Sequence, residues 1–305
     1  MTSTTGLAKS VHVRLVAYSK EIGVEAQLML ERFAIYRLLY RLSKSVYNER
    51  FVLKGAQLMA IWMGETVRPT RDADLLGFGD LSSETLTQTF RQICVQEVEP
   101  DGMEYLPDSV TVRPIREDNI YGGWRVTLQA RLGTARLHLQ VDVGIGNAVT
   151  PSPEWVELPR LLNFPTARLR AYRPETSIAE KLEAMVSLGL RNSRMKDYFD
   201  IYILSEYEPF DGRILLDAIR DTFRQRNTAI PNELPMALSH EFATDAGKAS
   251  QWKAFLRNIK ERPVTADLGE VIERLVAFLG PVLIAVRDQR NFSSQWPPGG
   301  PWDKR

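Results

Sequence analysis

The 305-residue chain has little cysteine, no long apolar run and almost no net charge. Its single cysteine, Cys94, excludes an intrachain disulfide, and its apolar helical surroundings favour a buried thiol over a nucleophile. No apolar run reaches the length of about 18 residues that a membrane helix needs, and residues 1–10 lack the basic and apolar regions of a signal peptide. We therefore expect a soluble cytoplasmic protein without membrane segments.

The charge balance and the scarcity of histidine exclude two further classes of site. The 39 basic and 38 acidic residues argue against a general electrostatic attraction to nucleic acid, so an RNA site must be a local patch. His12, His138 and His240 lie far apart without cysteine or histidine at ligand spacing, which gives a zinc site no support. The 44% of hydrophobic residues permit one large domain or two of ordinary size.

The most informative stretch begins with a short apolar segment, residues 51–53, followed by Lys54, Gly55 and Ala56. The apolar segment predicts a strand, and the small residues after it allow a sharp turn that can direct backbone N–H groups at an anion. Residues 57–63 fit a short helix. This order of elements indicates a phosphate-binding turn.

A second predicted strand, residues 70–76, carries two aspartates. Asp72 and Asp74 are two residues apart, so they project from one face of the strand. Two such carboxylates repel each other, and Mg²⁺, which prefers oxygen ligands, would compensate them. The alternative is a pair of solvated aspartates at a strand end.

Downstream, alternating segments predict more strands. These segments are residues 109–113, 124–132 and 135–143, and Gly133 supplies a tight turn between the last two. On the third segment, His138, Gln140 and Asp142 share the polar face. Asp142 would complete an acidic set if its strand lay beside that of Asp72 and Asp74. The alternative is again a solvated carboxylate.

Helical periodicity predicts amphipathic helices on both sides of this region, over residues 11–22, 25–42, 83–99, 213–224, 247–259 and 266–279, the last broken near Gly280-Pro281. The second of these helices carries Arg37 and Arg41 one turn apart. We expect this helix to be part of the scaffold, and contact of the two arginines with a polyanion is the alternative. Proline-rich residues 151–174 predict a connection between domains. Residues 177–180 resemble a capping box that opens a further helix.

This helix carries Lys181 at the edge of its apolar stripe. Without other information, a side chain there would extend its ammonium into water. Asp197 and Asp200 follow one turn apart on a helix that is apolar over much of its circumference. A buried aspartate must be paired, so Asp197 is expected to position Lys181 or to close the active site, with a role near a helix N-terminus as the alternative.

Three separated motifs resemble those of the AbiEii/AbiGii-type nucleotidyltransferase toxins, which include the MenT tRNA nucleotidyltransferases. They are Lys54-Gly55-Ala56 with Arg68-x-Thr70-x-Asp72-x-Asp74, Ala179-Glu180-Lys181-Leu182, and Lys196-Asp197-x-x-Asp200. The chain departs from the family pattern at Ala56, where glycine is usual, and at Lys196, where arginine is usual. Ala56 keeps the backbone donor but offers no hydroxyl to a phosphate.

The resemblance implies an α+β, DNA-polymerase-β-like nucleotidyltransferase domain with a small mixed sheet, followed by a helical C-terminal domain. We place the boundaries at 1–165, 166–290 and a disordered tail over 291–305. The resemblance also implies Mg²⁺, with Mn²⁺ as a substitute, an NTP substrate and a separately encoded antitoxin. The implied residues are Asp72, Asp74 and Asp142 as catalytic metal ligands; Lys54, Gly55, Ala56, Thr70 and Lys181 at the nucleotide; and Lys181 and Asp197 as further catalytic residues.

The acceptor expected from the resemblance is RNA, in particular the 3′ end of tRNA. Residues 113–173 contain nine arginines and five acidic residues, a surplus that favours a local RNA-binding surface that includes Arg168, Arg170 and Arg173. Two other functions stay open at this point. One is a non-catalytic module that binds nucleotide or protein, and the other is a kinase-like phosphotransferase that moves the γ-phosphoryl group.

Overall fold

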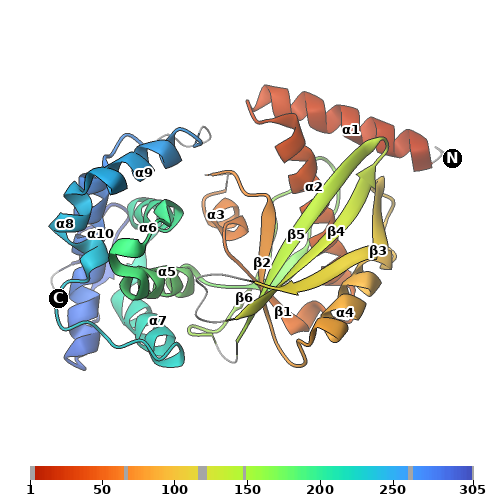
Figure 1. Ribbon diagram of the computed structural model, residues 1–305. Coiled ribbons are helices and arrows are strands. Elements are labelled where there is room, and N and C mark those ends of the chain that lie inside the picture. The colour runs from red at the N-terminus through yellow and green to blue at the C-terminus, as the bar shows by residue number, and fades with distance from the viewer. Residues whose placement is uncertain (1–3, 65–67, 116–121, 147–148, 260–263, 304–305) are drawn as a thin grey trace. The chain divides into compact units, whose positions relative to one another are not determined.

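The computed structural model describes residues 4–64, 68–115, 122–146, 149–259 and 264–303. Within these residues, no helix combines the length and the apolar character needed to cross a membrane. The chain divides into two compact units (Figure 1). The first comprises Met1–Asn147 and Glu154–Ala171, and the second comprises Ala148–Pro153 and Tyr172–Arg305.

The first unit is built on a mixed sheet. Its elements are α1 (Thr4–Glu21), α2 (Ala26–Lys44), β1 (Phe51–Lys54), α3 (Gln57–Trp62), β2 (Asp72–Gly77), α4 (Ser83–Val95), β3 (Met103–Pro114), β4 (Gly123–Leu132), β5 (Ala135–Ile145), β6 (Glu154–Glu157) and β7 (Arg168–Ala171). Over the described residues the seven strands lie in the order β3-β4-β5-β2-β1-β7-β6. β2 runs parallel to β5 and β1 parallel to β7, whereas the other neighbours are antiparallel.

The two faces of this sheet differ in chemistry because its strands alternate apolar and polar side chains. Along β4 and β5 the apolar side chains are buried on one face, while the other face carries polar and charged side chains. Helices α2 and α4 cover the apolar face: Tyr105 donates a hydrogen bond to the carbonyl oxygen of Ala34, and Phe51 packs edge-on against Phe90. In Figure 1, α2 passes behind β4 and β5. We call the opposite side the polar face.

Arg37 and Arg41 have a scaffold role, because both lie buried on α2 around Asp101. The Nε atom of Arg37 and the Nη1 atom of Arg41 each lie 2.7 Å from Oδ2 of Asp101. Burial opposes ionisation of Asp101, but the hydrogen bonds and charges of the two arginines outweigh it and lower the pKa of that carboxyl. This buried triad joins α2 to the start of β3.

Strands β6 and β7 lie in the proline-rich segment that the sequence predicted as a plain connection. They pair with each other, and β7 adds to the edge of β1 through Leu53 and Ala171. Each strand has only four residues, which is too short for an alternation to stand out between prolines. As a result, the first unit extends to Ala171 rather than to the predicted residue 165.

The second unit is helical. Its elements are α5 (Pro174–Leu188), α6 (Met195–Tyr207), β8 (Phe210–Asp211), α7 (Gly212–Gln225), α8 (His240–Thr244), α9 (Ala246–Leu256), α10 (Leu268–Arg287) and β9 (Gln295–Trp296). A mixed sheet followed by a helical unit confirms the fold class predicted from the sequence.

Helix α5 begins one turn earlier than the predicted capping box. Pro174 takes the first helical position, which suits its fixed φ, so Ser177 and Glu180 lie inside the helix. Glu180 instead accepts a hydrogen bond from Tyr172 and forms an ion pair with Arg226. The predicted capping role of these two residues is therefore wrong.

Helix α10 continues through Pro281, where the sequence predicted a break. A proline inside a helix removes one hydrogen bond and costs about 3 kcal/mol. Phe278, Leu279 and Val282 around it are fully buried, and Leu283 nearly so. Packing of this apolar stripe offsets the local cost, so the helix does not end.

Residues 291–303 pack against the helices of the second unit and do not form the predicted tail. Trp296 is 1% exposed, its ring centroid lies 4.8 Å from that of Phe278, and its indole donates to the carbonyl oxygen of Ser205. Trp302 stacks on the ring of Phe278, and its indole donates to the carbonyl oxygen of the same residue. The prolines and glycines of this segment disfavour regular structure, but its large tryptophan side chains hold it in place by burial against the helices.

Candidate functional site

Three predicted aspartates lie on the neighbouring strands β2 and β5, on the polar face. Asp72 and Asp74 lie on β2, and Asp142 on the parallel strand β5 pairs directly with Asp74. Paired residues of neighbouring strands point to the same side of a sheet, so all three carboxylates share the polar face. We call these three residues the aspartate cluster.

Strand β1 borders the cluster on its other side and explains the glycine after it. Lys54 pairs with Asp74, and Gly55 turns the chain with a φ of 75°, a conformation that L side chains rarely adopt. A Cβ atom at Gly55 would also overlap the carboxylate of Asp74. The Nζ atom of Lys54 reaches toward Gly144, where an added Cβ would lie 3.5 Å from it. Gly55 is thus required by both backbone conformation and space.

Two polar side chains position the strand that carries Asp72. Thr70, predicted at the nucleotide, donates its hydroxyl to Oδ1 of Asp72 at 2.7 Å. Gln57 at the start of α3 donates to the backbone oxygen of Asp72 at 3.1 Å. The hydrogen bond from Thr70 orients the Asp72 carboxylate, and the one from Gln57 holds the backbone at the start of β2.

Arg125 is the residue of this site that sequence reasoning did not assign to it. It lies on β4 opposite Asp142, and its Nε and Nη2 atoms donate to the two carboxylate oxygens of that residue, each at 2.9 Å. The hydrogen bonds to Asp142 raise the pKa of Arg125, and the charges of Asp142, Asp72 and Asp74 raise it further. The guanidinium therefore supplies positive charge to the whole aspartate cluster.

The cluster suits a divalent cation in its chemistry, and one of its three carboxylates is held by Arg125. Carboxylate oxygens are suitable ligands for Mg²⁺, which commonly takes one or two protein carboxylates and leaves places for substrate phosphates. Asp72 and Asp74 meet that requirement, whereas both oxygens of Asp142 are engaged by Arg125. Across the described residues, no three or more His, Cys, Asp or Glu side chains converge to hold a metal ion. A cation that drew on all three carboxylates would therefore have to displace the Arg125 guanidinium from Asp142.

In the second unit, Lys181 of α5 lies between the two aspartates of α6. Its Nζ atom is 2.9 Å from Oδ2 of Asp200 and 3.4 Å from Oδ1 of Asp197. Its side chain is 14% exposed, so the ammonium does not extend into water as the alternative required. Arg194 adds a contact of 2.6 Å from its Nε atom to Oδ2 of Asp197.

Lys181 is thus a partner of both buried aspartates, and it lies nearer to Asp200 than to Asp197. Both aspartates are fully buried, and such charges are tolerated only when paired. The spacing of three residues between them was visible in the sequence, but their convergence on Lys181 depends on how α5 and α6 pack.

The three predicted RNA-binding arginines fall on either side of the boundary between the two units. Arg168 and Arg170 are on β7 in the first unit, whereas Arg173 precedes α5 in the second and lies 3.5 Å from Glu175. Arg116, which belonged to the same basic segment, lies outside the described residues.

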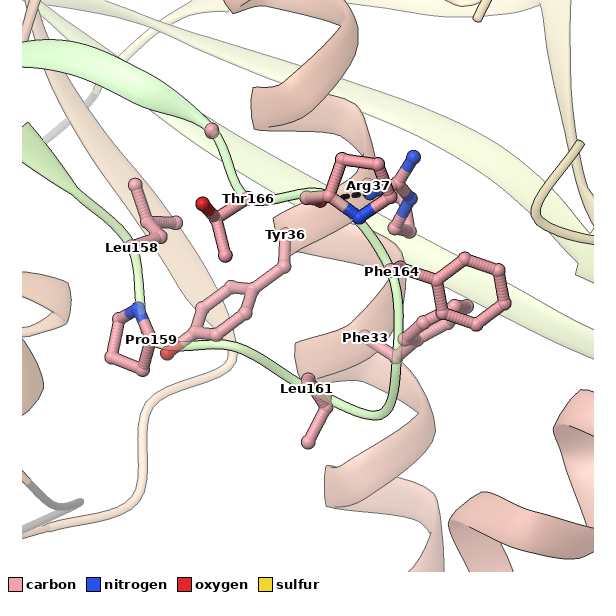
Figure 2. A pocket seen from close by; sticks show the side chains of 10 residues that line it. Phe33, Tyr36, Arg37, Leu158, Pro159, Leu161, Phe164 and Thr166 are labelled. Atoms are coloured by element: carbon pink, nitrogen blue, oxygen red, sulfur yellow. Dashed lines mark hydrogen bonds between the residues drawn. The ribbon is translucent and has the colours of Figure 1, made fainter. Parts of the chain in front are cut away.

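A recess elsewhere in the first unit does not carry this chemistry. It lies between α2 and the segment from Leu158 to Ala167, and Figure 2 shows Tyr36, Leu161 and Phe164 around it. Arg37, the charged residue of its lining, donates to the carbonyl oxygen of Pro165 and to Asp101. The recess is mainly apolar, and we assign it a packing role.

The chain presents a mixed sheet with three aspartates beside a glycine turn, followed by a helical unit, and its sequence matches a nucleotidyltransferase family. The chain belongs to the AbiEii family: residues 37–274 match the model of the nucleotidyl transferase AbiEii toxin, type IV TA system. This match confirms the family recognised from the motifs.

Two solved structures are similar over most of their length. JHP933 from Helicobacter pylori has 13% identity and a TM-score of 0.47, with 87% of this chain and 95% of that chain covered. A protein described as a nucleotidyltransferase, also from H. pylori, has 13% identity and a TM-score of 0.48, with 88% and 100% covered. No curated protein matches the chain. The family match alone carries the assignment.

Proposed function

We propose that this protein transfers a nucleoside monophosphate from an NTP to an RNA acceptor, in particular the 3′ end of tRNA. The observation that carries the proposal is the aspartate cluster, which sets Asp74 beside Asp142 on neighbouring parallel strands and Asp72 two residues away. Family membership supports the same reaction class. The RNA acceptor is part of the proposal, as is the use of Mg²⁺, with Mn²⁺ able to replace it.

In the proposed reaction, a hydroxyl oxygen of the acceptor forms a bond to the α-phosphorus of the NTP. The bond from that phosphorus to the β-phosphate bridging oxygen breaks, pyrophosphate leaves, and the hydroxyl proton passes to solvent. Such a transfer depends on positioning and charge stabilisation more than on covalent participation by the protein. A bound divalent cation would neutralise charge on the reacting phosphate.

Each residue near the cluster has a proposed part. Asp72 and Asp74 hold the cation, and Asp142 joins them or aligns the acceptor hydroxyl once Arg125 releases it. Both carboxylate oxygens of Asp142 accept hydrogen bonds from Arg125. Asp142 can therefore take this role if the guanidinium moves away, or if the guanidinium stays and adds a second positive charge beside the cation. Thr70 keeps Asp72 in the orientation that the cation needs.

The nucleotide triphosphate has its own proposed ligands. Lys54 and the backbone N–H groups of Gly55 and Ala56 lie at the β1 side of the cluster, where they can neutralise phosphate oxygens. Lys181 is the further cation proposed for the triphosphate, and the buried carboxylate of Asp197 positions it. A separately encoded antitoxin is the proposed protein partner, because the family belongs to type IV toxin-antitoxin systems.

The direct test is incorporation of label into RNA. The pure protein is incubated with total RNA and Mg²⁺, in separate reactions with each α-labelled NTP and each γ-labelled NTP. Label from an α-labelled NTP in RNA, without label from the γ-labelled form, supports nucleotidyl transfer. Label from the γ-labelled form alone would indicate a kinase-like phosphotransferase.

A matched pair of variants links the activity to the cluster. Asp74→Asn removes a proposed cation ligand at nearly constant size, whereas Asp108→Asn changes an aspartate on β3 outside the cluster. Incorporation by the Asp108 variant but not by the Asp74 variant is expected. Absence of incorporation from all four α-labelled nucleotides by the unaltered protein would refute the proposal.

A further inference from the structure

Strand register places most arginines of the basic segment on the polar face, with the aspartate cluster between them. Arg113 pairs with Arg125 and Arg131 pairs with Arg136, all on strands β3, β4 and β5. On the other side of the cluster, β7 carries further arginines. An extended polyanion that crosses this face would meet positive charge on both sides of the carboxylates.

The β6–β7 edge of the same face differs from the rest because it also presents an aromatic ring. Trp155 pairs with Arg170, and Glu157 pairs with Arg168, so these four side chains share one face. Leu53 and Ala171, which pair between β1 and β7, are buried on the apolar face. The neighbouring Arg170 must therefore point to the polar face, and Trp155 points there with it.

Trp155 is 44% exposed, and its ring is already in contact with a cation. The guanidinium carbon of Arg168 lies 5.5 Å from the ring centroid, within the range of a cation–π interaction. Large aromatic side chains at the surface favour binding sites, particularly when arginine lies beside them. The combination of an exposed ring and arginines is the chemistry that binds single-stranded nucleic acid, in which bases stack and phosphates pair with cations.

The edge also lies at a suitable distance from the aspartate cluster. Three strand spacings separate β6 from β2, which corresponds to about 14 Å across the sheet. An unpaired strand of a few nucleotides spans such a distance. The cluster and the aromatic edge can thus contact the same RNA strand.

We propose that Trp155, with Arg168 and Arg170, is a stacking site for a base of single-stranded RNA near the acceptor end. This inference rests on the proposed function for the identity of the substrate. The base stacks on the indole, and the two arginines pair with the adjacent phosphates. The site does not read sequence, because every base offers a face for stacking.

The test measures binding without catalysis, so it does not depend on turnover. A fluorescein-labelled, unstructured RNA 12-mer is titrated with the full chain in the absence of NTP, and fluorescence anisotropy is recorded at several salt concentrations. A matched oligomer with abasic positions keeps the phosphates and removes the bases. Trp155→Ala, Trp155→Phe and the double variant Arg168→Ala/Arg170→Ala are compared with the unaltered protein.

Stacking and charge predict different results. Trp155→Ala should weaken binding of the 12-mer about tenfold at every salt concentration, without altering the salt slope, and Trp155→Phe should recover most of the loss. The arginine double variant should instead flatten the salt slope by about 0.7 for each phosphate that no longer pairs with an arginine. With the abasic oligomer, the Trp155→Ala variant should bind as well as the unaltered protein.

Tyr18→Ala provides the control, because Tyr18 is an exposed aromatic of α1 in the same unit. It should bind the 12-mer normally, and the unfolding temperature of Trp155→Ala should be unchanged because the side chain is half-exposed. Equal affinity of Trp155→Ala and unaltered protein for the 12-mer would overturn the inference, as would the same loss with the abasic oligomer. Incorporation of label by unaltered protein is measured separately, so a failure of the proposed function is distinguished from a failure of this site.

Discussion

Removal of the Arg125 guanidinium should make the stability of the protein depend on divalent cations. In Arg125→Ala, the carboxylate of Asp142 loses two hydrogen bonds of 2.9 Å, and Asp72 and Asp74 lose a nearby positive charge. The Arg125 side chain is 45% exposed, so solvent screens the interaction and its contribution is about 1 kcal/mol, at the upper end for exposed pairs. A loss of that size lowers the unfolding temperature by about 2–4 °C in metal-free buffer.

The assay compares unfolding temperatures in EDTA and in saturating Mg²⁺. A cation that binds the folded protein stabilises it in proportion to its affinity, and Arg125 competes with that cation for the same carboxylates. The Mg²⁺-induced increase should therefore be larger in Arg125→Ala than in the unaltered protein, and Mg²⁺ affinity should rise about fivefold for a competition of about 1 kcal/mol. An equal or smaller increase in the variant would refute the idea that Arg125 and the cation share ligands.

Arg131→Ala is the matched control for this comparison. Arg131 lies on the same strand and the same face, but it pairs with Arg136 instead of a carboxylate. Its removal lowers the positive charge of the face by the same amount and relieves a like-charge pair. The difference between EDTA and Mg²⁺ should be the same as in the unaltered protein.

The other predictions concern the cluster, the lysine and the buried triad. Asp72→Asn and Asp74→Asn should each abolish incorporation of label while unfolding in EDTA occurs at an unchanged or higher temperature, because carboxylate repulsion falls; normal incorporation by both would exclude the cation assignment. Lys181→Ala should lose nucleotide transfer and also unfold at a lower temperature, because Asp200 is left buried without its partner at 2.9 Å. Lys181→Arg should recover stability better than transfer. Unchanged NTP affinity and turnover in Lys181→Ala would leave Lys181 a structural role only. Asp101→Asn should destabilise the protein by about 3–5 kcal/mol at pH 7, by urea unfolding, because two buried arginines lose their counter-charge. The folded pKa of Asp101 is lowered, so this carboxylate stabilises the protein above its unfolded pKa of about 3.9, and the stabilisation is lost as pH falls through the folded pKa. The difference in free energy of unfolding between unaltered protein and Asp101→Asn should therefore shrink in that pH range. A difference that stays constant with pH would contradict the assignment.

The parts of the fold that were predictable from sequence are those with a clear period. Strands β4 and β5 alternate over ten or eleven residues, and their turn at Gly133 fixes how they pair. Counting seven residues back from the turn pair Leu132 and Ala135 reaches Arg125 and Asp142. The sequence therefore contained the signal for this ion pair, and only the count along the two strands was needed to find it.

Other features required tertiary information. The four-residue strands β6 and β7 carry too few residues for a pattern, so the face on which Trp155 lies could not be predicted. Packing likewise decides that α10 continues through Pro281 and that Trp296 holds the C-terminal segment in place. In each case burial of a large apolar surface overrides a local preference of the backbone.

Charge compensation within each unit has a consequence for the ligand-free protein. The aspartate cluster is neutralised by Arg125 at one side, and Lys181 is neutralised by Asp197 and Asp200. Groups that attract a cation or a triphosphate thus have charge partners within the fold, which limits the destabilisation that their mutual repulsion causes before substrate binds. Binding must exchange these internal pairs for pairs with the ligand, which lowers affinity but leaves the residues in fixed positions. For that reason EDTA should change the unfolding temperature of the unaltered protein very little, and a large decrease would mean that the cation, and not Arg125, holds the cluster together.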